Sequence, residues 1–272
     1  MHNTVTRPGL SELHQSKKIY IATTFREFDG SANDEIQRLF LSSLQSQTYK
    51  KWQLSVTVFN EKTVEDTVRS IIPNAIIKTD ASRYKFSLTD VLLNTIDIAN
   101  NDEKSVIIWT TCDVIFENNF FENIIRNYSS KFSGTSHPHR YYQTVEQLNN
   151  RRDTFVYNIG FGIDTLFFAT KILSSETVKN IIKQYKFINW GYFEQFLVGI
   201  ALKYSDRRIN LSKLSFIIKI VNDRDANNET KEYFDECTIT NRPVLKEFFK
   251  NEGISDEFEH AHVCNGQFTP VK

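Results

Sequence analysis

The segment that most constrains the fold is the apolar run from Val106 to Trp109, which ends in a polar stretch containing Thr111 and Asp113. Consecutive β-branched and aromatic residues are typical of a strand that is covered on both faces in a parallel sheet. Ligands of open α/β sheets bind beyond the carboxyl ends of the strands. Thr111 and Asp113 are therefore expected where a nucleotide phosphate or its metal ion would bind. Alternatively, Asp113 caps or turns the chain before a helix expected to begin near Asn119.

The first half of the chain alternates between strand and helix patterns. Strands are expected at 19–24, 52–59, 75–78 and from 105 onwards. Helices are expected from Asp34 to at least Leu44, at 63–72 and at 87–100. This alternation predicts an α/β fold with a parallel, doubly wound sheet, and 272 residues suffice for one large domain.

The pattern weakens beyond Tyr128. Residues 137–152 are polar, aromatic and basic, and we expect a long loop or small insertion there. Further strands are expected at 155–160, 163–170 and 216–221, and further helices at 174–185, 193–204 and 244–251, followed by a polar tail.

The composition excludes several classes of protein. Lys+Arg and Asp+Glu both number 33, so no basic surface for nucleic acid or an anionic membrane is indicated. Residues 1–15 lack the apolar core of a secretory signal, and the longest apolar stretch, 196–202, is too short to span a bilayer. Three widely spaced cysteines argue against a disulfide framework and a cysteine-rich zinc site. A cytoplasmic protein is expected.

Residues 41–54 carry the most specific motif of the chain. They resemble the "S-hydrophobic-x-x-Q-x-Y-x-x-W-E-L" segment of GT-A-fold nucleotide-sugar glycosyltransferases, nearest to the family 2-like enzymes that build bacterial surface polysaccharide. Leu92-Leu93-Asn94 is similar to the "A-x-N" of that family. The resemblance runs from Ile19 to about Tyr204. It implies a GT-A-type, mostly parallel sheet flanked by helices, with a polar lead at 1–18, a transferase domain at 19–222 and a charged helical C-terminal extension at 223–272.

The metal motif of the family, Asp-x-Asp, corresponds here to Thr111-Cys112-Asp113. The resemblance implies that Asp113 binds the ion directly, whereas the first acid is replaced by Thr111. Mn²⁺ or Mg²⁺ can be held by one or two carboxylates together with substrate phosphates, so Asp113 and a diphosphate are chemically adequate. The ion would neutralise charge on the departing nucleoside diphosphate. His262 stands where many of these folds supply a metal-binding His, although a solvated tail is the simpler interpretation.

The resemblance also implies a set of donor contacts. Thr23 lies near the end of the first strand and Arg26 in the loop after it, and Arg83 occupies a loop that often carries a basic residue for the donor. Asn60 replaces an Asp that the family often places against uracil, and its amide can still bond to a base edge. The base therefore stays open, with a UDP-sugar favoured.

The segment Asn189 to Glu194 resembles the "W-G-x-E-D" turn, whose acid is the catalytic base in inverting enzymes. Glu194 is the candidate for this general-base role. Alternatively, it is a first-turn carboxylate favoured by the helix dipole. Trp190 and Gly191 of the same turn are candidate acceptor contacts. His139 and Arg140 are candidates for the acceptor or a phosphate, or belong to an exposed basic loop.

The resemblance implies a hexosyltransferase-type glycosyltransferase that moves a sugar from a nucleoside-diphosphate sugar to a saccharide or lipid-linked saccharide, and it favours an inverting outcome. O-antigen, capsule or lipooligosaccharide synthesis is the expected context. A lipid-linked acceptor would place the protein at the inner membrane face. The alternatives are a retaining GT-A transferase, in which Glu194 orients substrate, and a non-catalytic sugar-nucleotide-binding scaffold, suggested by Thr111 and Asn60.

Overall fold

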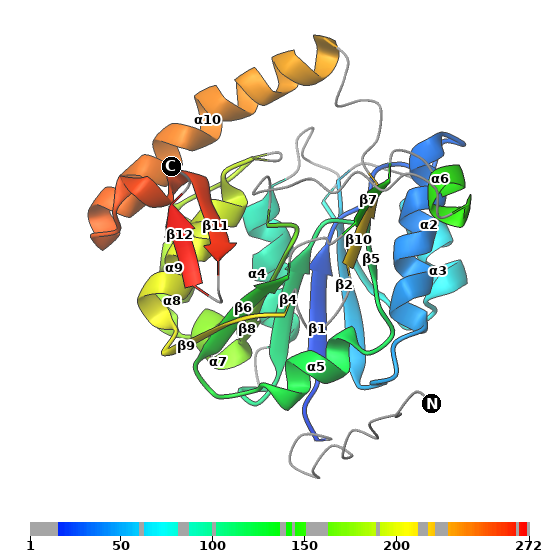
Figure 1. Cartoon of the computed structure of the whole chain (residues 1–272), viewed down its shortest axis with the longest axis horizontal. Helices are drawn as coiled ribbons and strands as arrows, with labels where there is room; N and C mark the ends of the chain where they lie inside the picture. Colours follow the sequence, from blue (N-terminus) through cyan, green and yellow to red (C-terminus); the bar gives the residue numbers. More distant parts are fainter. Residues whose placement is uncertain are drawn as a thin grey trace, which may run out of the picture.

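Seven strands form the main sheet, in the order β3-β2-β1-β4-β8-β6-β9 (Figure 1). The computed structural model describes residues 16–59, 63–80, 87–99, 102–136, 140–142, 145–150, 163–188, 191–211, 217–220, 228–264 and 267–270. The strands are β1 (Ile19–Thr23), β2 (Trp52–Val58), β3 (Ile76–Thr79), β4 (Val106–Thr110), β6 (Phe132–Ser136), β8 (Thr165–Ala169) and β9 (Arg207–Asn210). β8 runs antiparallel to both of its neighbours, whereas the other pairs are parallel. The predicted α/β class with a mostly parallel sheet is confirmed.

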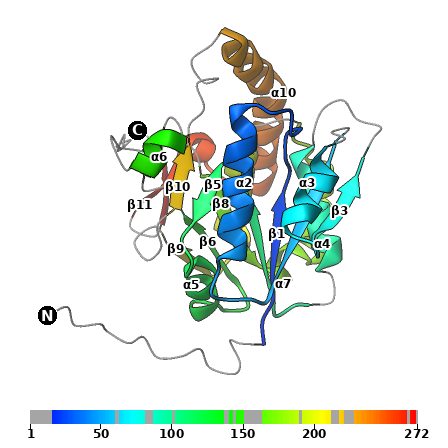
Figure 2. The same ribbon diagram turned by 90° about the vertical axis from the view of Figure 1, so that its right-hand side faces the viewer.

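Helices cover both faces of this sheet. One face carries α2 (Ala32–Gln45) and α3 (Val64–Ile71), which Figure 2 shows towards the viewer. The other carries α4 (Leu88–Ile98), α8 (Glu176–Gln184) and α9 (Phe193–Tyr204), with α10 (Asn228–Glu252) packed on α9. The shorter helices are α5 (Phe120–Arg126), α6 (Val145–Asn150) and α7 (Thr170–Leu173). None of the helices in the described ranges is long and apolar enough to cross a membrane.

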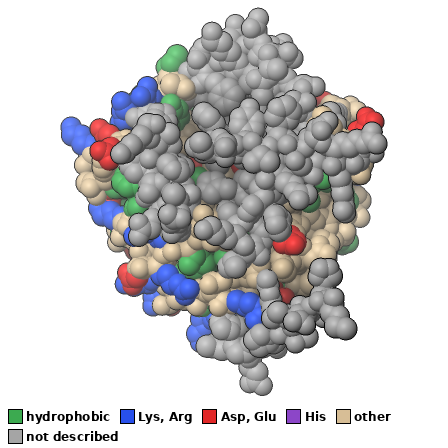
Figure 3. Space-filling view, in the orientation of Figure 1, with side chains coloured by type: hydrophobic (Ala, Val, Ile, Leu, Met, Phe, Trp, Pro, Cys, Tyr) green, Lys and Arg blue, Asp and Glu red, His purple; other side chains and the backbone are tan. Residues whose placement is uncertain are grey.

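Two smaller sheets complete the fold. β5 (Val114–Phe116), β10 (Ile217–Ile220) and β7 (Arg140–Tyr142) form a three-stranded sheet in the order β5-β10-β7. Near the C-terminus, the 3₁₀ helix η2 (Asp256–His260) leads into the hairpin of β11 (Ala261–Cys264) and β12 (Gln267–Pro270). On the face seen in Figure 3, the Lys and Arg side chains of the described residues are interspersed with Asp and Glu side chains.

Several expectations from the sequence were wrong. The strand expected at 163–170 exists as β8, but it runs antiparallel to β4 and not parallel to it. The segment 137–152, expected to be a long loop or a small insertion, contains β7 and α6, which a plain loop would not. α10 begins at Asn228 rather than at residue 244, and the expected polar tail contains η2 and a hairpin. The strand expected at 155–160 lies outside the described residues.

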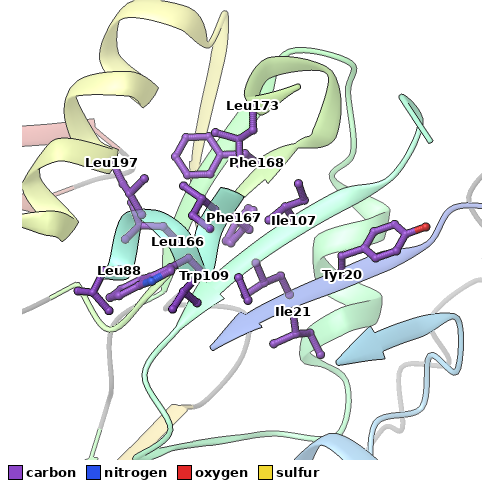
Figure 4. Close-up of a cluster of buried hydrophobic side chains, with 14 of the residues drawn as sticks. Tyr20, Ile21, Leu88, Ile107, Trp109, Leu166, Phe167, Phe168, Leu173 and Leu197 are labelled. Atoms are coloured by element: carbon purple, nitrogen blue, oxygen red, sulfur yellow. The ribbon is translucent and has the colours of Figure 1, made fainter. Parts of the chain in front are cut away.

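Strand β4 forms the centre of the core. No residue from Val106 to Thr110 is more than 1% exposed. The Trp109 ring meets Phe193 edge-on at 5.4 Å between centroids, and Figure 4 shows Trp109 among Leu88, Leu166 and Leu197. β4 is thus buried on both faces, as its uninterrupted apolar sequence predicts.

Gly134 marks the closest approach within the β8-β6-β9 part of the sheet. A Cβ atom on this residue would lie 2.4 Å from Phe167 Cζ and 2.5 Å from the Ile209 carbonyl oxygen. Neither distance is possible for carbon, so the Phe167 ring occupies the space that any other side chain would need.

The motif at 41–54 holds the chain together at several points. The buried Gln47 amide donates to the carbonyls of Ser43 (3.0 Å) and Glu117 (2.9 Å), and it accepts from the Phe121 N–H (3.1 Å). The Tyr49 hydroxyl donates to the Lys17 carbonyl. These two side chains fix α2 against the β5–α5 connection and against the entry to β1.

Tyr49 gives the protein a pH-dependent stability. Burial, together with the negative charge of Asp102, raises the pKa of Tyr49 to about 12. A tyrosine in the unfolded chain ionises near ~10, so between about pH 10 and 12 only the unfolded state loses this proton. The free energy of unfolding should fall through this window by at most about 1.4 kcal/mol per pH unit. Urea titrations from pH 8 to 11.5 should show a smaller decline in Tyr49→Phe, whereas parallel curves would contradict this assignment.

Candidate functional site

Polar side chains gather at the carboxyl edge of the central strands. β1, β2 and β4 run parallel, so Thr23 and Thr110, which end β1 and β4, lie at the same edge (Figure 1). Both side chains are 1% exposed. Thr24 Oγ1 donates to the Thr57 carbonyl at 2.8 Å, which ties the loop after β1 to the end of β2. This edge is where an open α/β sheet binds its ligands.

Asp113 follows directly after β4 and is half-buried. Thr111 Oγ1 donates to Asp113 Oδ1 at 2.5 Å, and the Thr111 N–H donates to the Asp164 carbonyl at 3.2 Å. Thr111 therefore orients the carboxylate from the position that a first acid would occupy. Asp113 does not cap a helix, because Asn119 is the residue that precedes α5 and β5 lies between them.

Gln37 is a residue that the sequence reasoning missed. Its side chain is 3% exposed, and its Oε1 accepts from the Arg26 N–H at 2.8 Å, while Nε2 donates to the Arg26 carbonyl at 3.3 Å. Cys112 Sγ lies 3.5 Å from the same Oε1. One amide on α2 thus links the loop after β1 to the residue next to Asp113. No local sequence signal marks it, since its partners are distant in the chain.

Asn94 of the "A-x-N" similarity has a structural role. Its Nδ2 donates to Thr57 Oγ1 at 2.9 Å, and its Oδ1 accepts from Lys78 Nζ at 2.6 Å. It therefore joins α4 to β2 and β3 near the carboxyl edge.

Glu194 lies in the first turn of α9, half-buried. The two residues before the helix have left-handed backbones, with φ 100° at Gly191 and 65° at Tyr192. Phe193 is fully buried, with its ring 5.4 Å from Trp109 and 5.7 Å from Phe187. This contact brings the amino end of α9 against β4, two residues before Thr111. In the first turn of α9, Glu194 is placed for a favourable interaction with the helix dipole.

The predicted site residues fall into four groups. Thr23, Arg26, Thr111 and Asp113 share the carboxyl edge, and Gly191 and Glu194 belong to the start of α9. Arg140 begins β7 and His262 belongs to β11, but their side chains are not described. Asn60, Arg83, His139 and Trp190 lie outside the described residues.

Two further residues bear on a metal site. The strand paired with His262 packs near β9, at the far edge of the sheet, so the structure does not place the backbone of His262 beside β4. Asp164 is 4% exposed and precedes β8, next to Thr111. Within the described ranges, no three His, Cys, Asp or Glu side chains are grouped to hold a metal ion.

Replacing Gln37 by Met should loosen the loop after β1. The Arg26 N–H and carbonyl would lose their partner, at a cost of about 1–3 kcal/mol in the free energy of unfolding. Amide exchange across residues 25–31 should accelerate. Gln45→Met is the matched control, because Gln45 is an exposed residue of the same helix whose amide bonds only the end of α3. Equal exchange in the two variants would contradict the role of Gln37.

Comparisons with known proteins show no family for this chain. No protein-family model matches the chain, and no curated protein sequence matches it. Among solved structures, it is similar to a mannosyltransferase from Pyrobaculum calidifontis in complex with GDP-Man and Mn²⁺, at 9% identity and a TM-score of 0.45, covering 77% of this chain and 56% of that one. The apo glycosyltransferase GlyE of Streptococcus pneumoniae TIGR4 matches at 13% identity and a TM-score of 0.42, covering 86% of this chain and 63% of that one.

Nucleotidyltransferases are similar to the same degree. The 4-diphosphocytidyl-2C-methyl-D-erythritol synthase of Anaerococcus prevotii matches at 10% identity and a TM-score of 0.44, covering 78% of this chain and 90% of that one. The chain spans less than two thirds of the two glycosyltransferases. The fold and the site together define an α/β protein whose polar groups gather at the carboxyl edge of a mostly parallel sheet.

Proposed function

We propose that this protein is a glycosyltransferase that moves a sugar from a nucleoside-diphosphate sugar to a saccharide acceptor. The observation that carries the proposal is that two acidic residues, Asp113 and Glu194, lie in segments attached to the same strand, β4. Asp113 is oriented by Thr111 at the end of β4, and Glu194 opens the helix that packs on the same strand through Phe193 and Trp109. The resemblance of residues 41–54 to GT-A transferases supports the same activity.

The donor site comprises Asp113 and the residues around it. Thr23 at the end of β1 and Arg26 in the loop after it are proposed to contact the donor, with Asn60 at the base and Arg83 as a further donor contact. Hard oxygen ligands suit Mn²⁺ or Mg²⁺, and these ions commonly use one or two carboxylates beside substrate phosphates. Asp113 fits this mode as the main ligand. His262, the other metal ligand that the resemblance implies, lies on the hairpin that packs near β9, so the proposal does not depend on it. When bound, the ion would neutralise charge on the leaving diphosphate.

Glu194 is proposed as the base that takes the proton of the acceptor hydroxyl while that oxygen attacks the anomeric carbon. The bond from the anomeric carbon to the diphosphate breaks, and the product has inverted configuration. Trp190 and Gly191 would contact the acceptor from the same turn, with His139 and Arg140 as further contacts. NMR of the product anomer separates this route from the retaining alternative.

The finer assignment follows the resemblance alone. It describes a hexosyltransferase that favours UDP-sugars. The enzyme would work in the cytoplasm, in the synthesis of O-antigen, capsule or lipooligosaccharide. A lipid-linked acceptor would bring it to the inner membrane face.

A second candidate is a non-catalytic protein that binds sugar nucleotides. The observation in its favour is Thr111, which donates a hydrogen bond to Asp113 and stands where the resemblance expects the first acid of the metal motif. Release of free sugar or transfer product by the purified protein would exclude this candidate.

Donor binding should appear as metal-dependent thermal stabilisation in a panel of nucleoside-diphosphate sugars. Ligand at one hundred times its dissociation constant adds about 2.7 kcal/mol to the free energy of unfolding, so a true donor is detectable. In Asp113→Asn, Mn²⁺ should no longer increase the thermal stabilisation that the donor gives. Asp206→Asn is the control, because Asp206 is an exposed partner of Lys131 at the opposite edge of the sheet. Unchanged metal dependence in Asp113→Asn would overturn the metal assignment.

Glu194→Gln should lower the transfer rate by about 10²–10⁴, the usual contribution of a general base, without reducing stability substantially. Glu176→Gln is the matched control, since Glu176 is an exposed acid in the first turn of α8 and gives the same helix-dipole effect. If both variants retain full activity, Glu194 is only a helix-terminal charge.

A further inference from the structure

A buried amide from the C-terminal helix holds the turn that precedes Glu194. Asn241 of α10 is 0% exposed. Its Oδ1 accepts from the Ile188 N–H at 3.2 Å, and its Nδ2 donates to the carbonyls of Ile188 (2.8 Å) and Gly191 (3.1 Å). Both amide hydrogens and the amide oxygen are therefore engaged by the backbone of Ile188 and Gly191.

The chain before this turn is fixed from the other side by α4. The Leu88 N–H donates to the Phe187 carbonyl at 3.1 Å, and the Phe187 N–H donates to Thr89 Oγ1 at 2.9 Å. Ile188 forms an isolated antiparallel bridge with Ser87. α4 thus holds the chain as far as Ile188, while the bonds of Asn241 extend to Gly191.

Beyond Ile188 the backbone needs support. Tyr192 adopts a left-handed conformation that is unfavourable for a residue with a side chain, and it follows Gly191, which is also left-handed. Such conformations persist where the surroundings determine them. The bond from Asn241 to the Gly191 carbonyl acts on the residue just before this strained position, and Glu194 follows two residues after Tyr192.

We propose that Asn241 is a positioning residue for the catalytic base, so that α10 contributes to the site although it comes from the last part of the chain. The proposal rests on the proposed function of Glu194. Misplacement by about 1 Å can cost on the order of 10²-fold in rate, so the orientation of this turn matters to the base and not to donor binding on β1 and β4.

The test compares Asn241→Ala with Asn251→Ala. Asn251 lies farther along α10, and its amide also ties the helix to the body, through the Tyr185 hydroxyl at 2.8 Å. Three quantities are measured in each variant: the unfolding temperature, amide exchange across residues 186–196, and kcat and donor KM for transfer. Should Asn241→Ala not fold, Asn241→Ser, which keeps a small polar group, takes its place.

We expect faster exchange at 186–196 and a kcat reduced tenfold or more in the Asn241 variant, with donor KM within about twofold of the wild type. The Asn251 variant should keep its kcat. Equal losses of kcat in both variants, or an unchanged kcat in the Asn241 variant of an active enzyme, would overturn the role of Asn241 alone. A wild-type protein that neither transfers a sugar from any donor nor hydrolyses one would overturn the proposed function, and the positioning role with it.

Discussion

The burial of β4 on both faces is the constraint on which the rest of the structure depends. β4 pairs with β1 on one side and with the antiparallel β8 on the other, and its side chains pack under α4 and α9. A slip of one residue would exchange every side chain between the two faces, so this register is strongly determined. Its end point, and with it the location of Thr111 and Asp113, follows from packing rather than from any interaction with a ligand.

Side-chain amides continue this order where the strands stop. Gln37 on α2 and Asn241 on α10 each satisfy an N–H and a carbonyl of a neighbouring segment, as a further strand would have done. A buried backbone group without a partner is costly, so each amide is restricted to one orientation. The two flanks of the site are therefore held by helices on opposite faces of the sheet.

The sequence predicted the elements whose own residues carry the apolar pattern of a buried strand or helix. α9 was predicted at its observed bounds, because a compact apolar run follows a glycine turn, and β4 was predicted from its apolar run. β6 was missed, since Phe132 is its only large apolar residue and its burial comes from β8 and β9. The first half of α10 was missed because Pro243 lies inside the helix, and a proline usually marks a helix boundary. Motif spacing drew attention to Asp113 and Glu194, whereas Gln37 and Asn241 act on distant segments and leave no local pattern.

The backbone at Tyr192 also limits how this part of the molecule can evolve. Its φ of 65° is open to Gly, and to Asn or Asp at little cost, but it is closed to Val, Ile and Thr because branching at Cβ crowds the left-handed conformation. Natural variation at the position beside Glu194 is thus filtered by backbone geometry before any selection for chemistry acts. Sequence divergence is therefore easier in the side chains around Tyr192 than at Tyr192 itself.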